Sequence, residues 1–546
     1  MSNKTAETSQ QQAHNFVSLI AAQATLQPQH TALVVPLMKG QKLCGEQRVD
    51  YQTLMAISGA LQQGLRADGF VRGDRVVVLL RPGILLYALI IALLGAGMVP
   101  VFIDGGMPRA TVRRALRAAN ARALISHRKL LWRAILLPEV RALRRYAAEG
   151  TLPFARSITH LQARPGNLIV EPLDDDDHGL ITFTSGSTGV PKGANRTHGS
   201  LRQQHLAIRR HWPDQPGDID MPSFPVLVLH NLCCGMTTVL PRADLAQPGQ
   251  VNGHPVIEQI RSERISRLSG APAYMQRLAL AARERPECLL SLREIVIGGA
   301  TVSPALMALL SEAFANTSIK LVYGSTEAEP IAEISLAEAI AADNDQGYLL
   351  GPAAGGSEVW LVNPDMPLQT EQDVEKARCL PGQVGELLVR GAHVLKGYID
   401  NPEADRQNKI PCGSGLVWHR TGDTAFSDPL GRLWLVGRLR ERVRGMDVLP
   451  LEKMLERAQP NCRVALLQQT DAAQSVLLCI AGEASLHNLD QHALGNLCRR
   501  LQLAQLPLYL LDTLPVDARH NSKLDRARLR QLVTRRTPDH CFRAST

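Results

Sequence analysis

The segment that most constrains the fold is residues 180–193, where an apolar, β-prone run leads directly into a loop of small residues. Of the eight residues 184–191, six are Ser, Thr or Gly, and a lysine follows them. Small residues let backbone N–H groups close around an anion, hydroxyls add donors, and a lysine adds a point charge suited to a polyphosphate. The candidate phosphate-binding residues are Thr184, Ser185, Gly186, Ser187, Thr188, Gly189 and Lys192.

Two other interpretations of this loop are weaker. A Ser/Gly-rich surface loop is common, but it does not explain why the loop follows a buried-looking strand and ends in Pro-Lys-Gly. A Walker A loop is excluded because Lys192 lies between Pro191 and Gly193 rather than within Gly-Lys-Ser/Thr. The segment therefore predicts a strand that ends in an anion-binding loop of another type.

Short apolar runs alternate with helical patterns along the first part of the chain. Residues 75–80 and 123–126 have the composition of strands, and residues 50–68 form a helical pattern entered at Asp50 and left at Gly69. Such alternation predicts an α/β fold in which helices cover a parallel or mixed sheet.

Strand patterns run into glycine-rich turns again at residues 292–302 and 319–327. Together with the loop at 184–191 they make three such transitions. In an α/β sheet, turns of this kind meet in a crevice at the carboxyl ends of the strands. We therefore expect the three turns to form one site.

The length of the chain predicts more than one domain. A chain of 546 residues is too long for a single hydrophobic core. After Pro381 the pattern becomes rich in short strands, and Gly437-Arg438-Leu439-Arg440 opens a last stretch of about a hundred residues. The predicted division is a large N-terminal domain of β-sheets covered by helices, residues 1–438, and a smaller C-terminal domain, residues 439–546.

The net charge of +9 and the sequence pI of about 9.1 suggest a nucleic-acid, lipid or small anionic partner. The arginines are interpreted as spread along the chain, with isolated pairs such as Arg209-Arg210 and Arg499-Arg500, and aromatic residues make up only 4%. Proteins that bind single strands need aromatic side chains among the basic ones. The composition therefore favours solvated faces plus an anionic small-molecule site, and no nucleic-acid partner.

Cysteine usage and the apolar segments indicate in which compartment the protein resides and whether it spans a membrane. Ten cysteines occur without a CxxC pair or a metal-ligand spacing, which predicts a reducing compartment, the cytoplasm, and no zinc site. Residues 1–14 are polar and Gln-rich, which predicts a disordered lead rather than a signal peptide. Residues 83–103 are nearly all apolar, but Gly95, Gly97 and Pro100 interrupt them, so a buried helix, a turn and a buried strand are favoured over a transmembrane segment.

The phosphate-loop string resembles that of the AMP-forming adenylating enzymes, which include acyl-CoA synthetases, peptide-synthetase adenylation domains and luciferases. The resemblance covers nearly the whole chain. It implies that residues 1–438 are an AMP-binding adenylation domain and that residues 439–546 are a mobile α+β lid. It also implies ATP and Mg²⁺ as cofactors and a small-molecule carboxylic acid as substrate.

Several strings resemble the family's nucleotide-binding segments. Gly-Gly-Ala resembles the backbone segment along the adenine, and the tyrosine of Tyr-Gly-Ser-Thr-Glu resembles the residue that stacks on that ring, although a core tyrosine is the alternative. Thr-Gly-Asp and Gly-Arg resemble the ribose-binding pair. The residues implied are Gly298, Gly299, Ala300, Tyr323, Gly324, Thr326, Asp423 and Arg438.

Two further residues resemble the family's catalytic groups. Glu327 corresponds to the magnesium ligand, and a hard cation that bridges phosphates needs only one or two carboxylates. Lys523, in His-Asn-Ser-Lys-Leu, occupies the place of the catalytic lysine, although the usual string there is closer to Ser-Gly-Lys and an isolated surface lysine is the alternative. The implied reaction begins when the substrate carboxylate attacks the α-phosphate of ATP and expels pyrophosphate. The small domain then swings about a hinge near Arg440.

The acyl-pocket stretch, residues 224–241, lacks the acidic anchor that adenylation domains use for an amino group, so a hydrophobic acid is favoured. Its string Gly-Met-Thr-Thr-Val-Leu-Pro looks most like the olefin-biosynthesis branch. Enzymes of that branch adenylate a long-chain β-hydroxy acid, whose own hydroxyl displaces AMP to close a β-lactone. His230 is a candidate to orient or deprotonate that hydroxyl, and a pocket-wall histidine is the alternative.

Other acceptors stay open. The loop at residues 442–450 carries a single glycine, Gly445, and is shorter than the loop that helps to place coenzyme A in many ligases. A fatty acyl-CoA ligase that uses coenzyme A is one alternative. An acyl-AMP ligase that delivers to a carrier protein or to pathway enzymes is another.

Overall fold

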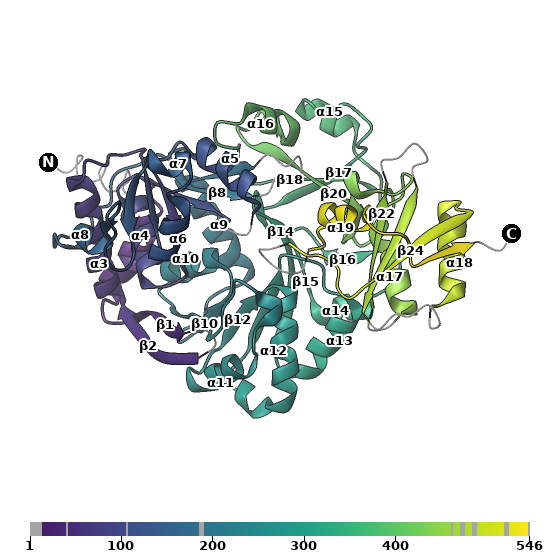
Figure 1. Cartoon of the computed structure of the whole chain (residues 1–546), viewed down its shortest axis with the longest axis horizontal. Coiled ribbons are helices and arrows are strands. Elements are labelled where there is room, and N and C mark those ends of the chain that lie inside the picture. The colour runs from purple at the N-terminus through teal and green to yellow at the C-terminus, as the bar shows by residue number, and fades with distance from the viewer. Residues whose placement is uncertain are drawn as a thin grey trace.

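The computed structural model of the chain describes residues 14–39, 42–104, 107–184, 191–459, 462–469, 475–482, 489–517 and 523–543. Within these ranges the strands form four sheets. Figure 1 shows the N-terminal elements, in purple to teal, on one side and the C-terminal sheet, in green to yellow, at the opposite end. The predicted α/β class is confirmed.

A seven-stranded sheet carries the phosphate-loop strand. All of its strands run parallel except β9, which pairs antiparallel with β8. Val76 and Val78 pack in a core with α3 and α4, whereas Val77 packs on the other face with α5, α6 and α7, because successive side chains of a strand point to opposite faces. In sheet order the strands are β7 (Arg156–Ser157), β6 (Arg144–Ala147), β5 (Ala123–Ser126), β3 (Arg75–Leu79), β4 (Val99–Ile103), β8 (His178–Thr184) and β9 (Lys192–Thr197). The helices are α3 (Tyr51–Ala67), α4 (Ile84–Gly95), α5 (Arg109–Ala119), α6 (Arg128–Ala134), α7 (Pro138–Arg141) and α8 (Ile158–Gln162).

Helix α3 begins and ends where the sequence predicts. The side chain of Asp50 accepts a hydrogen bond from the backbone N–H of Thr53 at 2.7 Å, which satisfies a donor at the helix start. Gly69, two residues after the helix, has φ +80°, a conformation that favours glycine. The capping residues therefore fix both ends of this helix.

The apolar segment at residues 83–103 forms α4, a glycine turn and β4, as predicted. Every residue of 86–95 is buried against neighbouring helices and the sheet. Within the described residues, no helix has the length and apolar character needed to cross a membrane. The hydrophobicity of this segment is explained by its burial in the protein core.

A second sheet of eight strands lies beside the first. Its central strands are parallel, and β15 and β2 close its edges in antiparallel pairs. Helices α11, α12 and α13 cover one face, and Val296 on the other face packs against α9 and α10. In sheet order the strands are β15 (Ala328–Ser335), β14 (Ser318–Ser325), β13 (Glu294–Gly298), β12 (Arg267–Gly270), β10 (Ile219–Pro222), β11 (Thr237–Val239), β1 (Thr31–Lys39) and β2 (Lys42–Asp50). The helices are α2 (Val17–Leu26), α9 (His198–His211), α10 (Pro225–Cys234), α11 (His254–Ser262), α12 (Pro272–Glu284), α13 (Pro304–Ala313) and α14 (Leu336–Ala341).

The third sheet contains the strands predicted after Pro381, together with β16 and β17 from before that residue. It is entirely antiparallel and carries both halves of the predicted ribose pair on neighbouring strands. Its strands are β16 (Tyr348–Gly351), β17 (Glu358–Val362), β18 (Gly385–Arg390), β19 (Lys409–Pro411), β20 (Val417–Ser427) and β21 (Leu433–Arg438). Helices α15 (Glu371–Lys376) and α16 (Pro402–Asn408) connect these strands.

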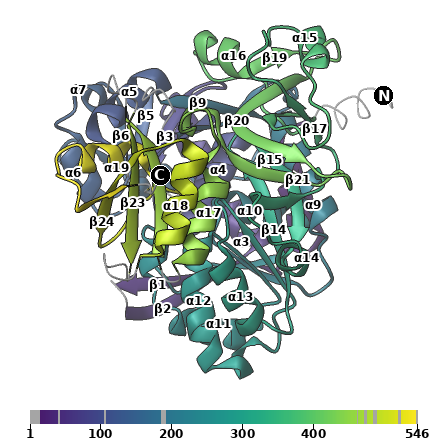
Figure 2. The same ribbon diagram turned by 90° about the vertical axis from the view of Figure 1, so that its right-hand side faces the viewer.

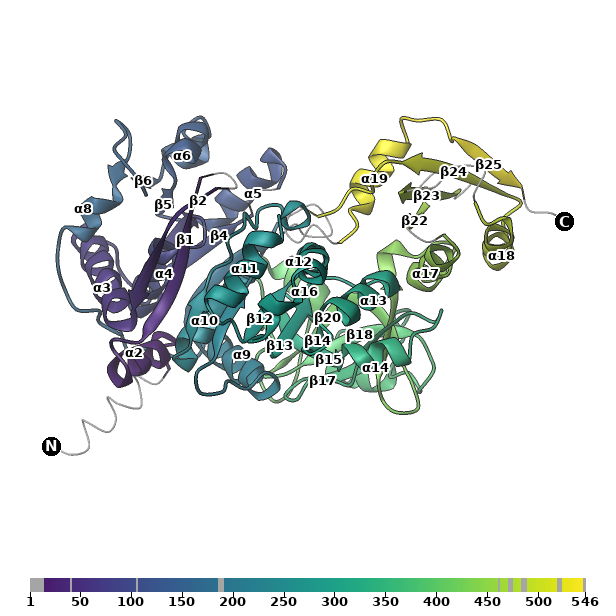
Figure 3. The ribbon, with the colours of Figure 1, turned by 90° about the horizontal axis from the view of Figure 1, so that it is seen from below.

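The fourth sheet forms a separate α+β unit with its own core, as Figure 3 shows at one end of the molecule. Helices α17 and α18 cover one face and α19 covers the other. Buried Lys453 of α17 donates to the carbonyl oxygen of Gly347 at 2.6 Å and pairs with Asp343, so it ties this unit to the larger part. The elements are α17 (Val448–Ala458), β22 (Cys462–Gln468), β23 (Val476–Gly482), α18 (Gln491–Leu501), β24 (Gln505–Leu511), α19 (Arg526–Val533) and β25 (His540–Arg543).

Candidate active site

The predicted phosphate loop connects β8 to β9. Thr184 at the end of β8 pairs across the ladder with Lys192 at the start of β9. Because β8 runs parallel to β4, the loop leaves the carboxyl edge of the sheet. Ser185, Gly186, Ser187, Thr188 and Gly189, and the side chain of Thr184, lie outside the described residues, so their roles stay a prediction.

Glu327 lies in the tight turn between β14 and β15, and its Oε1 accepts a hydrogen bond from the Tyr398 hydroxyl at 2.8 Å. Burial alone raises the pKa of Glu327, but the electrostatic effects of His419 and Lys409 and this hydrogen bond outweigh burial and lower the pKa to about 2. Burial lowers the pKa of His419 to about 3, so that ring is neutral at neutral pH. Glu327 is therefore a carboxylate at neutral pH, which is the state that a divalent cation requires.

Two lysines lie beside the ring of Tyr398. Lys192 Nζ is 5.3 Å and Lys409 Nζ is 5.6 Å from the ring centroid, within the range of a cation–π contact. Burial lowers the pKa of both lysines, to about 8 for Lys409, while the carboxylate of Glu327 opposes the shift. The two ammonium groups concentrate positive charge next to Glu327, an arrangement suited to a polyphosphate.

The third sheet brings the predicted ribose pair together. Asp423 of β20 and Arg438 of β21 are direct partners in the ladder, and Arg438 Nε lies 2.7 Å from Oδ1 of Asp423. The hydroxyl of Tyr323 donates a hydrogen bond of 2.6 Å to Oδ2. Oδ1 is buried, yet among the described groups it has no well-aligned hydrogen-bond donor. It is therefore an acceptor that a ligand hydroxyl could satisfy.

The two strings predicted to contact the adenine leave adjacent strands. Gly298 at the end of β13 is paired with Val322 of β14. Gly298-Gly299-Ala300 and Tyr323-Gly324 consequently lie at the same edge of the sheet. Gly299 has φ +90°, which a residue with a side chain adopts only at a cost.

Arg196 connects the phosphate hairpin to the Tyr-Gly-Ser-Thr-Glu turn. Its guanidinium donates to Oγ1 of Thr182 at 3.0 Å and to the carbonyl oxygen of Thr326 at 2.9 Å. Ser325 Oγ, in the same turn, is buried without a hydrogen-bond partner among the described groups. Sequence reasoning missed Arg196, Tyr398, Lys409 and His419, because none belongs to a recognisable string and only the tertiary fold brings them to the site.

Lys523 is placed differently from the other predicted residues. It lies in the fourth-sheet unit, where its backbone N–H donates to Oδ1 of Asp517 at 2.8 Å and the backbone N–H of Asp517 donates to its carbonyl oxygen. Its side chain is exposed, whereas Glu327 and Asp423 are enclosed by the large part. The structure therefore brings Lys192, Glu327, Tyr323, Asp423 and Arg438 into buried clusters and leaves Lys523 at the surface.

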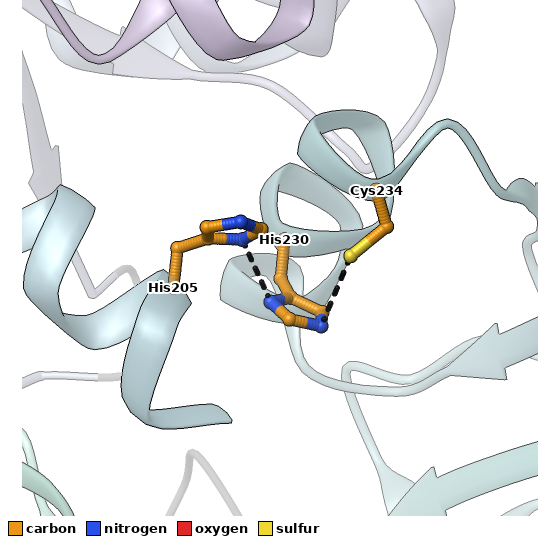
Figure 4. Close-up of side chains that lie close together, drawn as sticks. All are labelled: His205, His230 and Cys234. Atoms are coloured by element: carbon orange, nitrogen blue, oxygen red, sulfur yellow. Dashed lines mark hydrogen bonds between the residues drawn. The ribbon is translucent and has the colours of Figure 1, made fainter. Parts of the chain in front are cut away.

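His230 is buried in α10 with both ring nitrogens engaged (Figure 4). Its Nδ1 is 3.0 Å from Nδ1 of His205 in α9, and its Nε2 is 3.6 Å from Sγ of Cys234 one helical turn later. One of the two facing Nδ1 atoms must carry a proton and the other must accept it, so the three residues form a hydrogen-bonded chain. Neither nitrogen of His230 is available to a substrate in this arrangement without breaking one of these contacts.

The same three residues could hold a metal ion, since one ligand atom from each lies within 4.8 Å of the others. Burial lowers the pKa of His205 to about 4 and, with the charges of His205, Arg267 and Arg209, lowers that of His230 well below its usual value. Burial also raises the pKa of the Cys234 thiol to about 12. A neutral hydrogen-bonded chain accounts for these contacts without a cation.

The predicted acyl-pocket stretch separates into two sides. One side packs against α9 and β13. It consists of Phe224, Val226 and Leu227, which contact Ile208 in α9 and Trp212 directly after it. Val228 and Leu229 instead belong to the core between the first sheet and α10. The helical period of about 3.6 residues places them on the opposite face. Val228 and Leu229 therefore do not line the same apolar side as Phe224, Val226 and Leu227.

Comparisons of the sequence with known proteins agree with this geometry. Residues 20–399 match the AMP-binding enzyme family. An olefin beta-lactone synthetase of Stenotrophomonas maltophilia is 31% identical over 508 residues, covering 88% of this chain and 90% of that protein. An olefin beta-lactone synthetase of Xanthomonas campestris is 29% identical with the same coverage.

Solved structures with the same fold include an amide bond synthetase from Marinactinospora thermotolerans. It has a TM-score of 0.77 and 22% identity and covers 95% of this chain and 99% of its own. An O-succinylbenzoate coenzyme A synthetase from Bacillus subtilis, solved with ATP and a magnesium ion, has a TM-score of 0.73 and 18% identity and covers 94% of this chain and 99% of its own. Because the sequence family, the fold and the clustered strings agree, the chain belongs to the AMP-binding enzyme family and is an AMP-forming acid ligase.

Proposed function

We propose that this protein uses ATP and Mg²⁺ to convert a hydrophobic β-hydroxy acid into its acyl-adenylate and then into a β-lactone. The observation that carries the proposal is the 31% identity to an olefin beta-lactone synthetase over 88% of the chain. The clustering of the predicted nucleotide residues at one edge of the structure supports the first half of the reaction.

In the first half, the ribose hydroxyls would donate hydrogen bonds to the carboxylate of Asp423, which Arg438 and Tyr323 hold in place. The adenine would lie along Gly298-Gly299-Ala300 and on the ring of Tyr323. Ser185, Gly186, Ser187, Thr188, Gly189, Gly324 and Thr326 would surround the phosphates. Lys192 contributes positive charge there.

Glu327 would hold Mg²⁺, since it is kept ionised by its surroundings. The cation would neutralise charge on the phosphate oxygens. The substrate carboxylate oxygen attacks the α-phosphorus, and the bond to the pyrophosphate oxygen breaks. Positioning and electrostatic stabilisation carry most of the rate in such a transfer.

The exposed position of Lys523 fits a catalytic lysine that arrives only when the lid closes. The proposed boundary lies between residues 438 and 439, with the hinge near Arg440. That residue lies in a short 3-10 helix, Leu439–Glu441, between the third sheet and α17. In the arrangement described here the lid rests on the large part through Lys453 and Asp343.

In the second half, the β-hydroxyl oxygen bonds to the acyl carbon, AMP leaves, and the hydroxyl proton goes to a basic group or water. The nucleophile is already attached to the electrophile, so attack is unimolecular, and effective molarities for oriented groups reach about 10⁵ M or more. The apolar side formed by Phe224, Val226 and Leu227 would keep water away from the adenylate. His230 acts in this step only if its contact with His205 or Cys234 opens.

A fatty acyl-CoA ligase is the second candidate, because a feruloyl-CoA synthase of Amycolatopsis is 28% identical over 75% of the chain. Against it, residues 443–446 close a tight turn in which Val443 and Met446 exchange backbone hydrogen bonds of 2.9 Å. Arg442 and Asp447 pair at 3.1 Å across the base of the turn. Such a turn leaves few backbone donors for coenzyme A.

The test is a substrate panel. Purified protein receives ATP, Mg²⁺ and fatty or β-hydroxy fatty acids, with and without coenzyme A, and AMP and product masses are measured. The proposal expects turnover of β-hydroxy acids without coenzyme A and a product lighter than the acid by one water. If thioesters form, and form only when coenzyme A is present, the protein is instead a fatty acyl-CoA ligase.

A further inference from the structure

The positive charge of this protein is concentrated in one segment. Residues 109–145 contain eleven Lys and Arg but a single acidic residue, Glu139, which gives a net charge of +10. The whole chain has a net charge of +9, so all other residues together sum to −1. The expectation that the arginines are spread along the chain is therefore wrong for this segment.

The segment forms one side of the molecule. It runs through α5, β5, α6, α7 and β6, and its three helices cover the outer face of the seven-stranded sheet. Figure 2 shows α5, α6 and α7 near one another at its upper left. The charges of the three helices therefore lie over one face of this sheet, whereas Arg122, which pairs with Asp74, and Arg144 lie over the ring of Phe70.

Only part of this charge is neutralised. Glu139 pairs with Arg113 and Arg117, the latter at 2.7 Å. Within the described residues, no carboxylate pairs with the exposed side chains of Arg128, Lys129 or Arg133 on α6. A row of cations without counter-charges repels itself unless an anionic surface is brought close.

Large apolar side chains are exposed on the same helix and two residues after its end. Leu130, Trp132 and Leu136 are 40%, 51% and 64% exposed. The indole of Trp132 packs edge-on against Phe154 at 5.0 Å between ring centroids, which holds it in place. We call Arg128, Lys129, Leu130, Trp132, Arg133 and Leu136 the α6 patch.

We propose that the α6 patch docks this protein on the surface of an anionic lipid bilayer. Segments that lie in the bilayer interface combine lysine and arginine with exposed tryptophan and leucine, as the α6 patch does. Each basic residue near an anionic leaflet adds attraction, and tryptophan prefers the headgroup level. A bilayer also presents the continuous negative charge that a segment of net charge +10 matches, which one acidic protein helix does not.

Docking on a membrane is consistent with the reaction proposed above, and this part of the argument rests on that proposed function. A long-chain hydroxy acid partitions into membranes, so an enzyme held at the bilayer meets its substrate there. Helix α6 follows β5, which belongs to the same seven-stranded sheet as the phosphate-loop strand β8.

Vesicle binding by the full-length protein tests the proposal. Sedimentation is measured with vesicles of phosphatidylglycerol and phosphatidylcholine in equal parts and with phosphatidylcholine alone, at about 0.05 M and about 0.5 M salt. We expect binding only to the anionic vesicles, lost at high salt. The emission of Trp132, the one exposed tryptophan of five, should shift to shorter wavelength on binding.

Two matched variants isolate the patch. Arg128→Glu with Lys129→Glu and Arg133→Glu should weaken vesicle binding by about tenfold or more. Arg499→Glu with Arg500→Glu and Arg535→Glu makes the same change in net charge at exposed positions of the lid and should bind like the parent. A third variant, Leu130→Ser with Leu136→Ser, keeps the charge and should weaken binding and reduce the Trp132 shift.

Three results would overturn the proposal. They are absence of binding to anionic vesicles at low salt, equal binding by the α6 and lid variants, and binding of a DNA duplex or an acidic protein without binding of vesicles. Vesicle binding needs no turnover, so its failure is distinct from a failure of the proposed reaction. Turnover of a water-soluble short acid should be the same in the parent and all three variants, which also shows that they fold.

Discussion

The nucleotide side and the acyl side of the candidate site treat buried ionisable groups in opposite ways. On the nucleotide side, Glu327 stays ionised, with a pKa of about 2, because the Lys409 ammonium and the Tyr398 hydroxyl compensate for its burial. On the acyl side, burial holds His205 neutral at a pKa of about 4 and Cys234 as a thiol at a pKa of about 12. The nucleotide side therefore stabilises charged groups in a low-dielectric interior, whereas the acyl side keeps its buried groups neutral.

Because of this difference, substitutions on the two sides should affect different properties, catalysis on one side and stability on the other. Charged groups that are placed to bind the polyphosphate contribute to catalysis, so their removal should reduce the rate of adenylate formation. A neutral hydrogen-bonded chain contributes mainly to folding, so its removal should change stability and its pH dependence.

The largest effect is expected for Lys523→Ala. Loss of one preorganised cation at the reacting phosphate should lower acid-dependent pyrophosphate release by about 10²–10³-fold, while ATP binding stays nearly unchanged. The measurement is pyrophosphate release together with ATP binding by calorimetry. Lys376→Ala, an exposed lysine of α15, is the control. Unchanged release would remove Lys523 from the mechanism.

Glu327→Gln keeps the shape of the side chain and removes its charge. We expect a loss of about 10²-fold in pyrophosphate release that rising Mg²⁺ partly restores, because the remaining phosphate oxygens still attract the cation. The measurement is a Mg²⁺ titration of the parent, of this variant and of the exposed control Glu403→Gln. A variant whose Mg²⁺ dependence matches the parent would argue against the ligand role.

The two sides should lose stability in different pH ranges. Glu327 has a lowered pKa in the folded state, so its contribution is present above about pH 4.5 and is lost as the pH falls towards about 2. His205 is held neutral while the unfolded chain takes up a proton, so stability falls as the pH drops from about 6.5 to about 4. Urea unfolding across this range should show a shallower slope between pH 6.5 and 4 for His205→Gln with His230→Gln than for the parent.

The exposed His492→Gln is the control for that experiment and should leave the slope unchanged. Glu327→Gln should change the slope of the curve only below about pH 4.5. If both variants change the same pH range, the contrast between the two sides is wrong.

The smallest effect is expected for Cys234→Ala. It removes one end of the hydrogen-bonded chain and should lower the free energy of unfolding by about 1 kcal/mol or less. Added Zn²⁺ should not raise the melting temperature of the parent. A Zn²⁺-dependent rise that disappears in Cys234→Ala would identify a metal site in place of the neutral chain.

Sequence patterns predicted the parts of the site that lie on strand-to-turn transitions. Asp423, Arg438 and Tyr323 were predicted because each stands in a short string that resembles a family segment, and the boundaries of α3 were predicted because Asp50 and Gly69 act through local backbone geometry. Tyr398 and Lys409 were missed because their roles arise only when the third sheet packs beside the phosphate hairpin.

Two further failures have different origins. The pairing of His230 with His205 depends on the packing of α10 against α9, which no local pattern encodes. The basic segment at 109–145 was missed because its arginines recur at helical spacing, as at Arg113 and Arg117, rather than as long adjacent runs. Patterns that act over a few residues are readable, and those that need a tertiary contact are not.

The central claim is that the second nucleophile belongs to the substrate itself. The most direct measurement incubates the protein with ATP, Mg²⁺ and a long-chain β-hydroxy acid without coenzyme A, and follows AMP and product mass. The account predicts one AMP for each product molecule and a product lighter than the acid by one water. Stalling at acyl-adenylate until coenzyme A is added, with a thioester as the product, would contradict it.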